Sequence, residues 1–376
     1  MRPSQRAPWR SGVWRRWGAA LTAVAALGLV LAPSAPATSG GQGRSLGHFA
    51  QRNLVSDVPG EAEIMDPNLV NAWGLAFGPN TPAWVSDAEK DVSTLYAGGV
   101  NGSPVTKIPL TVSIPGGAPT GMVFNSSPGF VVHSGSSSGA AAFLFSSETG
   151  HITGWSPAVP PSTEAQNAVT VPGAIFKGLA IANADGGPRI YATDFHNGQV
   201  DVWDSGFARV NKPGAFHDSR IPSGFAPFGI QTVNGDVVVT YAKQDEDAED
   251  DVAGVGNGFV DVYDTDGNLL RRFARRGPLN SPWGIALAPQ GFGRASGALL
   301  IGNFGDGRIH AYDPVSGKLL GALRDKRGKR ISIDGLWALE FGNGVIGTRE
   351  TLLFTAGPEE EEHGLFGELT AVHGGH

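Results

Sequence analysis

The side chains best suited to chemistry in this sequence belong to two runs of acidic residues. The first run is Asp245, Glu246, Asp247, Glu249, Asp250 and Asp251, and the second is Glu359, Glu360, Glu361 and Glu362. Carboxylates held close together gain by sharing a hard cation such as Ca²⁺, which prefers oxygen ligands. The first run lacks the alternating acids and the glycine of an EF-hand loop. Two interpretations therefore stay open: solvated loops that keep the protein soluble, or a cation-binding rim with calcium as the preferred ion.

Other kinds of site have weaker support. The sequence has no cysteine, which excludes disulfides, thiolate chemistry and thiolate-bound zinc. Its histidines show neither helical i, i+4 spacing nor a tight cluster, and the serine-rich stretch 134–139 lacks the G-x-S-x-G pattern of a serine nucleophile. Trp73, Trp283 and Trp337 could stack on a sugar, but their places inside short apolar runs predict packing in the core.

The N-terminus predicts export. Residues 1–37 contain five arginines, an apolar run and then Ala35-Pro36-Ala37, which is the order of a secretory signal peptide. Arg15-Arg16 matches a twin-arginine signal poorly, so ordinary secretion is preferred, to the extracellular space or the exterior of the cell envelope. The apolar run is too short for a stable membrane anchor. Residues 38–47 are predicted to form a flexible spacer.

Net charge excludes some partners. The whole chain has a formal net charge of -7, and loss of a basic signal peptide makes the remainder more acidic. Such a surface repels nucleic acid and anionic membranes. We expect a monomer that binds an extracellular ligand or protein, whose identity the sequence does not give.

A repeated pattern organises the rest of the chain. Asn71-Ala72-Trp73-Gly74-Leu75-Ala76 is its clearest copy, and the later copies are centred on residues 121, 178, 229, 284 and, more loosely, 338. The third to fifth copies are followed by a second signature, G-x-[VI]-x-[VA]-[WY]-D. Alternation of apolar and polar residues over such short runs indicates strands.

Units of about fifty residues with four short strands are typical of a β-propeller. The sequence predicts an all-β, six-bladed β-propeller over residues 48–376, with four antiparallel strands in each blade. The sixth unit ends after its third strand, Gly364 to Val372, whereas residues 48–56 form a strand without a partner. We therefore expect the N-terminal strand to complete the last blade.

The motifs also carry a resemblance to known families. The repeats resemble NHL-type six-bladed propellers. The opening Asn53-Leu54-Val55-Ser56-Asp57, together with the stretch 66–76, resembles a family of secreted bacterial proteins without an assigned activity. Some members of that family end in a sorting anchor, which this chain lacks. The resemblance implies a fold and a location, and it brings no catalytic residues with it.

One face of the propeller is the expected place for a site. The loops that enter the innermost strands emerge on the same face as the loops between second and third strands, and both acidic runs are predicted to lie in loops of the latter kind. Asp87, His133, Asp194, His196, Asn303 and Asp306 are assigned to the same kind of loop. Both acidic runs should therefore project from one face.

Five oxygen donors from different blades could meet at the mouth of the central channel on that face. They are Asn71, Asp194, Asn280, Asn303 and Asp334. Propellers that resemble lactonases and gluconolactonases bind one divalent metal there, where it polarises a carbonyl or activates water. Against this hypothesis, the glutamate of such enzymes is not evident, and Lys177 would place a positive charge in the same mouth.

The sequence thus predicts a secreted binding module whose acidic face recognises a ligand, cation or protein. A metal-dependent hydrolase of the lactonase type is the alternative, and whether the protein is an enzyme stays open. Any cofactor is unknown, with a single divalent cation, preferably calcium, as the candidate.

Overall fold

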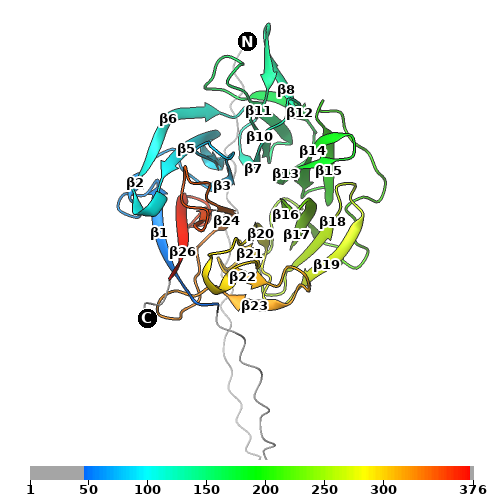
Figure 1. Ribbon diagram of the computed structural model, residues 1–376. Helices are drawn as coiled ribbons and strands as arrows, with labels where there is room; N and C mark the ends of the chain where they lie inside the picture. Colours follow the sequence, from blue (N-terminus) through cyan, green and yellow to red (C-terminus); the bar gives the residue numbers. More distant parts are fainter. Residues whose placement is uncertain (1–45, 373–376) are drawn as a thin grey trace, which may run out of the picture. The chain divides into compact units, whose positions relative to one another are not determined.

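The computed structural model describes residues 46–372. The predicted signal peptide, most of the predicted spacer and residues 373–376 lie outside the described residues. Six antiparallel sheets stand in a ring, with the first strand of each closest to the centre (Figure 1). This is the predicted six-bladed β-propeller.

The strands follow the order that the repeats predict. Blade one contains β3 (Ala72–Ala76), β4 (Ala83–Asp87), β5 (Val92–Gly98) and β6 (Val105–Ser113). Blade two contains β7 (Pro119–Phe124), β10 (Phe143–Ser147), β11 (His151–Trp155) and β12 (Gln166–Thr170). Blade three contains β13 (Phe176–Ala184), β14 (Gly187–Asp194) and β15 (Gln199–Asp204).

The second half repeats the same plan. Blade four contains β16 (Phe225–Val233), β17 (Asp236–Lys243), β18 (Gly258–Tyr263) and β19 (Leu269–Arg275). Blade five contains β20 (Pro282–Leu287), β21 (Leu299–Asn303), β22 (Ile309–Tyr312) and β23 (Leu319–Ala322). Blade six contains β24 (Leu336–Phe341), β25 (Leu352–Ala356), β26 (Leu365–Val372) and β1 (His48–Ser56), with the short β2 (Ile64–Met65) parallel to β1.

The N-terminal strand closes the ring as predicted. β1 pairs antiparallel with β26 in a register that runs from His48 opposite Val372 to Ser56 opposite Leu365. Closure gives the third strand of blade six a partner from the start of the chain, so that strand is no longer a free edge.

Blades two and three differ from the predicted four-strand plan, and blade six has β2 as a fifth, parallel strand. In the described chain blade three has three strands, and a single bridge between Trp203 and Arg209 marks the place of a fourth. Blade two has an additional hairpin, β8 (Val131–Ser134) and β9 (Ser137–Ala140), between its first and second strands. Because of this hairpin, the assignment of His133 to a loop between second and third strands is wrong, since His133 lies on β8.

The repeated glycine has a packing reason. Around the channel each innermost strand lies against the innermost strand of the next blade. A Cβ atom on Gly284 would lie 2.6 Å from the carbonyl oxygen of Trp337, and one on Gly229 would overlap the backbone of Trp283. The pattern therefore requires glycine so that neighbouring blades can approach closely.

Buried hydroxyl groups join neighbouring blades at the same level. Thr193 Oγ1 donates to the carbonyl oxygen of Phe228 (2.7 Å), and Thr240 Oγ1 donates to that of Pro282 (2.6 Å). Thr355 makes the corresponding bond to Trp73 and thus links blade six to blade one. These bonds satisfy innermost-strand carbonyls that face the adjacent blade.

Helix is confined in the described residues to three 3₁₀ turns of three residues each, η1 (Ala88–Lys90), η2 (Val100–Gly102) and η3 (Gly293–Ala295). Among helices in residues 46–372, none has the length and apolar character needed to cross a membrane.

Candidate functional site

Aromatic rings fill the centre of the propeller at the loop face. Trp73 and Trp337 stack with their centroids 3.7 Å apart, and Phe304 stacks on the other side of Trp337 at 4.0 Å. Phe228 and Trp283 pack at the edges of Trp337. Because these rings come from blades one, four, five and six, they can meet only near the axis. The tryptophans serve as core, as their positions in the repeat predicted.

Lys177 lies directly against this aromatic plug. It follows the first residue of β13, its side chain is buried, and its Nζ atom lies 5.4 Å from the ring centroid of Trp73 and 5.9 Å from that of Phe195. Such placement over ring faces favours a cation.

Two carboxylates, Glu148 and Asp250, pair with Lys177. Its Nζ atom pairs with Glu148 and lies 3.1 Å from Asp250 Oδ1. Burial alone would lower the pKa of Lys177, but the charges of Glu148, Asp250 and Glu361 outweigh burial and raise it. The amine therefore stays protonated at neutral pH and is a fixed cation rather than a nucleophile.

Asn71 connects the plug to the second acidic run. Its Oδ1 atom accepts a hydrogen bond from Trp337 Nε1 (3.0 Å), and its Nδ2 atom donates to Glu361 Oε2 (2.6 Å). Burial, followed by the charge of Glu148, raises the pKa of Glu361 to about 8, although Lys177 and Asn71 oppose the shift. We call Lys177, Glu148, Asp250, Glu361 and Asn71 the channel-mouth cluster.

The second acidic run forms an unusual turn. Glu359, Glu360 and Glu361 are all in the left-handed region, with φ values of 56°, 57° and 70°. Each costs about 1 kcal/mol relative to ordinary backbone. Asp334 Oδ2 accepts from the backbone N–H of Glu359 (2.9 Å), and Asp57 Oδ1 accepts from that of Gly364 (2.8 Å). These two aspartates hold the turn at both ends.

The first acidic run folds back on itself between β17 and β18. The N–H of Asp245 donates to the carbonyl oxygen of Asp250 (2.9 Å), and Asp245 Oδ1 accepts from the N–H of Glu249 (3.0 Å). Burial raises the pKa of Asp251 to about 6. Glu246, Asp247 and Glu249 stay exposed, as do Glu359, Glu360 and Glu362 of the other run, and we call these six residues the acidic loop face.

Four of the five predicted metal-ligand candidates make hydrogen bonds to loop backbone, and the Asn71 side chain bonds to Trp337 and Glu361. Asp194 accepts from the N–H groups of Ile175 and Asn197, and Asn280 Oδ1 accepts from that of Gly254. Asn303 donates to the carbonyl oxygen of Pro278 and to Asp306, whereas Asn71 and Asp334 make the bonds given above. In the described part of the chain no hydrogen bond joins any two of the five.

The channel itself offers little room. Beyond the plug, the innermost strands enclose a cavity of about 30 Å³ whose polar lining is Gln231 and Glu340, which are hydrogen-bonded to each other at 3.2 Å. This volume suits about one water molecule, whereas small-molecule sites measure roughly 300–1,000 Å³. Within residues 46–372, no three His, Asp or Glu side chains are grouped so that they could hold a metal ion.

The sequence did not identify Glu148 as part of this site. It lies in the loop between β10 and β11, the place that the sequence had assigned to His133. A sign was present in Glu148-Thr149-Gly150, an acid in a tight turn between two strand-like runs. Because the extra hairpin of blade two shifts the count of strands, the loop that contains Glu148 was not recognised as the loop between the second and third strands.

The proteins with related sequences are viral. No protein-family model matches the sequence. The chain is 30% identical over 331 residues to "Uncharacterized protein R648" of Acanthamoeba polyphaga mimivirus, covering 84% of this chain and 78% of that protein. It is also 30% identical over 349 residues to "Uncharacterized protein L690" of the same virus, covering 88% and 87%. Because these relatives are viral, they do not support the expectation of a bacterial family.

Solved structures with some similarity include two enzymes. One is a virginiamycin B lyase from Staphylococcus aureus with quinupristin, with a TM-score of 0.48 and 11% identity, covering 86% of this chain and 99% of the lyase. The other is a gluconolactonase from Xanthomonas campestris, with a TM-score of 0.48 and 13% identity, covering 81% of this chain and 87% of the enzyme.

Proposed function

We propose that this protein is a secreted recognition module whose acidic loop face binds a basic partner. The chain belongs to the β-propeller family of the mimivirus proteins R648 and L690. The partner presents clustered lysine or arginine side chains. The signal-like order of residues 1–37 supports export.

One observation carries this proposal. Asp250 and Glu361, from acidic runs more than a hundred residues apart, both approach Lys177, so blades four and six present their carboxylates on one face. Among the ion pairs of the described residues, none involves Glu246, Asp247, Glu249, Glu360 or Glu362. Exposed charges of one sign raise the encounter rate with an oppositely charged partner and select against like-charged ones.

The side chains at the channel mouth favour a role in recognition over a role as a hydrolase. The chain supplies its own cation there, because Lys177 occupies the space between the carboxylates. Aromatic rings close the channel behind it. A partner would therefore contact the loops around the mouth rather than enter the channel.

The test compares basic and acidic ligands. We expect the purified protein to bind an oligolysine peptide in low salt, to lose that binding as salt is added, and to ignore an oligoglutamate peptide, all measured by isothermal titration calorimetry. Glu246→Gln, Asp247→Asn and Glu249→Gln together should weaken oligolysine binding by about tenfold or more.

A matched variant neutralises three exposed acids on loops of the opposite face: Glu164→Gln, Asp185→Asn and Glu350→Gln. It should bind oligolysine as the parent protein does. Equal binding by both triple variants, or no binding in low salt, would contradict the proposal. A calcium titration of the same proteins tests the other ligand, since saturable calcium binding lost only in the loop-face variant would replace the basic partner by a cation.

A further inference from the structure

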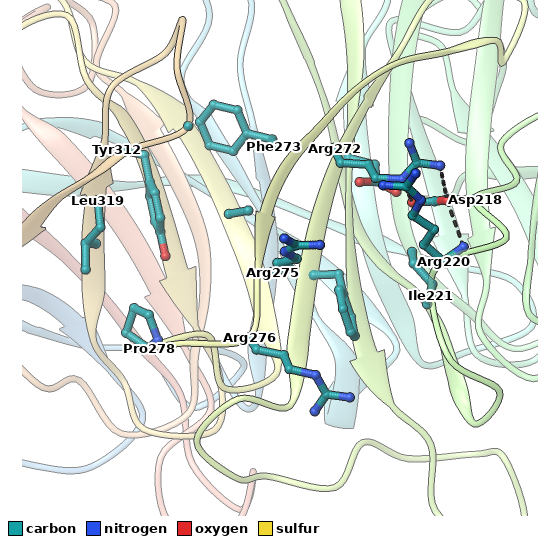
Figure 2. Close-up of a pocket in the computed structure, with 14 residues that line it drawn as sticks. Asp218, Arg220, Ile221, Arg272, Phe273, Arg275, Arg276, Pro278, Tyr312 and Leu319 are labelled. Atoms are coloured by element: carbon teal, nitrogen blue, oxygen red, sulfur yellow. Dashed lines mark hydrogen bonds and ion pairs between the residues drawn. The ribbon is translucent and has the colours of Figure 1, made fainter.

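A groove that shares no residue with the channel-mouth cluster lies between the outer strands of blades four and five (Figure 2). Its volume is about 460 Å³, within the range of small-molecule sites. The walls come from β18 and β19 of blade four, from β22 and β23 of blade five, and from the connection that leads into blade four.

Four arginines line this groove, and three of them lack an acidic partner. Arg272 makes a bidentate pair with Asp218, with distances of 2.7 and 2.6 Å. Arg220, Arg275 and Arg276 make no ion pair with any residue in the described range 46–372. Figure 2 shows the side chain of Arg275 between Arg272 on one side and Tyr312 on the other. The groove therefore contains guanidinium groups that the fold leaves unneutralised.

The second acid of the groove does not cancel this charge. Asp261 lies on β18 and is only 2% exposed. Burial, followed by the nearby charge of Asp218, raises its pKa to about 7. At neutral pH a large share of Asp261 is uncharged, so the local excess of positive charge persists although the whole chain is acidic.

A buried hydroxyl provides a second sign of a ligand. Tyr312 lines the groove at 3% exposure, and its hydroxyl group has no hydrogen-bond partner among the described residues. Burial raises its pKa, so the group stays an O–H donor. Buried donors normally find an acceptor, and the described residues provide none for this hydroxyl group. Phe273, 5.8 Å from the Tyr312 ring, and the exposed Leu319 add an apolar wall.

The next groove around the ring is an internal control. It lies between blades three and four, has a volume of about 340 Å³, and is also lined by cationic side chains. There Arg209 pairs with Asp201, and both Arg189 and Lys212 pair with Asp266. The same position in the fold can therefore have its cations neutralised, and the groove between blades four and five differs in this respect.

We propose that the groove between blades four and five binds a small molecule in which a carboxylate or phosphate group is attached to an apolar ring. Arg220 and Arg275 hold the oxyanion, because a guanidinium group offers paired N–H donors that match carboxylate and phosphate oxygens. Tyr312 donates a further hydrogen bond, and Phe273 and Leu319 contact the ring.

The test uses benzoate and phenyl phosphate as probes, with phenol as the neutral comparison. We expect one or both anions to bind the purified protein saturably in calorimetry or ligand-observed NMR, and phenol to bind at least about tenfold more weakly. Benzoate and phenyl phosphate separate the two oxyanion classes. Absence of binding by both anions, or equal binding of phenol, would overturn the proposal.

Variants locate the binding in this groove. Arg220→Gln with Arg275→Gln should weaken binding of the anion by about tenfold or more, and Tyr312→Phe by about three- to tenfold with the ring retained. Arg189→Gln in the neighbouring groove should change the affinity less than about twofold. Anion binding that is unchanged in the Arg220/Arg275 variant, or lost equally in Arg189→Gln, would overturn it. Circular dichroism melts of all variants show that the fold is intact.

Discussion

The channel mouth and the groove between blades four and five both gather charged side chains around aromatic rings, yet they treat those charges differently. At the mouth, Lys177 is buried and pairs with Glu148 and Asp250, and Glu361 bonds to Asn71. In the groove, Arg220 and Arg275 face a space of about 460 Å³ without an acidic partner in the described chain. The charges of the mouth stabilise the fold, whereas those of the groove are available to a ligand.

Removing the mouth cation should have the largest effect. Lys177→Met keeps most of the volume but leaves the carboxylates of Glu148 and Asp250 without their cation. We expect a loss of about 2–4 kcal/mol in the free energy of unfolding, below the usual cost of breaking a buried pair because solvent reaches Glu148 and Asp250. Denaturant unfolding measures this loss. Arg275→Gln is the matched cation from the groove and should change stability by less than about 0.5 kcal/mol. Equal effects of the two variants would remove the distinction between the regions.

Deleting single hydroxyl groups sharpens the same contrast. Thr240 Oγ1 donates to Pro282 (2.6 Å) and accepts from the N–H of Gly229 (2.9 Å). Thr240→Val should therefore cost about 1–3 kcal/mol, because two backbone groups lose their partner. Tyr312→Phe should change stability by less than about 0.5 kcal/mol, because the lost hydroxyl has no protein partner. Thermal and denaturant unfolding provide the values, and a Tyr312→Phe loss as large as that of Thr240→Val would show that the hydroxyl supports the fold.

The smallest expected difference between the two regions is in how the free energy of unfolding depends on pH. The pKa of Glu361 is raised from 4.5 to about 8, so the folded state binds a proton that the unfolded state releases at lower pH. Stability from this group is complete below pH 4.5 and falls as the pH rises through about 8. With partial solvent access, we expect a decrease of about 1–2 kcal/mol that Glu361→Gln removes.

The groove acid provides the comparison for this measurement. For Asp261, whose pKa is raised from 3.8 to about 7, the corresponding decrease ends near pH 7, and Asp261→Asn should remove it. Between pH 7 and 8, most of the remaining decrease in the free energy of unfolding should come from the ionisation of Glu361. Unfolding curves recorded from pH 4 to 9 would contradict this assignment if stability rose with pH in the parent relative to Glu361→Gln.

Much of the fold could be predicted because its physical requirement appears at fixed spacing. Five of the six innermost strands have a residue without a side chain where the next blade approaches, namely the glycines at 74, 121, 178, 229 and 284, and blade six has Ala338 there. The missing strand of blade six and the spare strand at 48–56 predicted the closure. The hairpin in blade two was not predicted, because β9 (Ser137–Ala140) consists of serine, glycine and alanine and lacks the apolar alternation typical of a strand.

The site was harder to predict than the fold. The two acidic runs lie between the second and third strands of their blades, as predicted, whereas Lys177 lies on β13 and not in the entering loop, and the sequence treated it only as an objection to a metal. Which carboxylates reach Lys177 depends on how the long loops fold back, and no periodic pattern in the sequence reports that geometry. The arginines at 271, 272, 275 and 276 stand together in the sequence, yet only the structure shows that Arg271 stacks on Phe273 while Arg275 and Arg276 line the groove.

The pairing of β1 with β26 also bears on how the protein is made. The strand around residue 50 is among the first parts of the described fold to leave the ribosome, and its partner around residue 370 is among the last. Blade six therefore cannot be completed until β26 is made, and β1 lacks this partner while five blades are produced. Loop-closure entropy grows only slowly with such a separation, so the delay is mainly kinetic. A chaperone that shields one β-strand for the duration of translation would serve this architecture well.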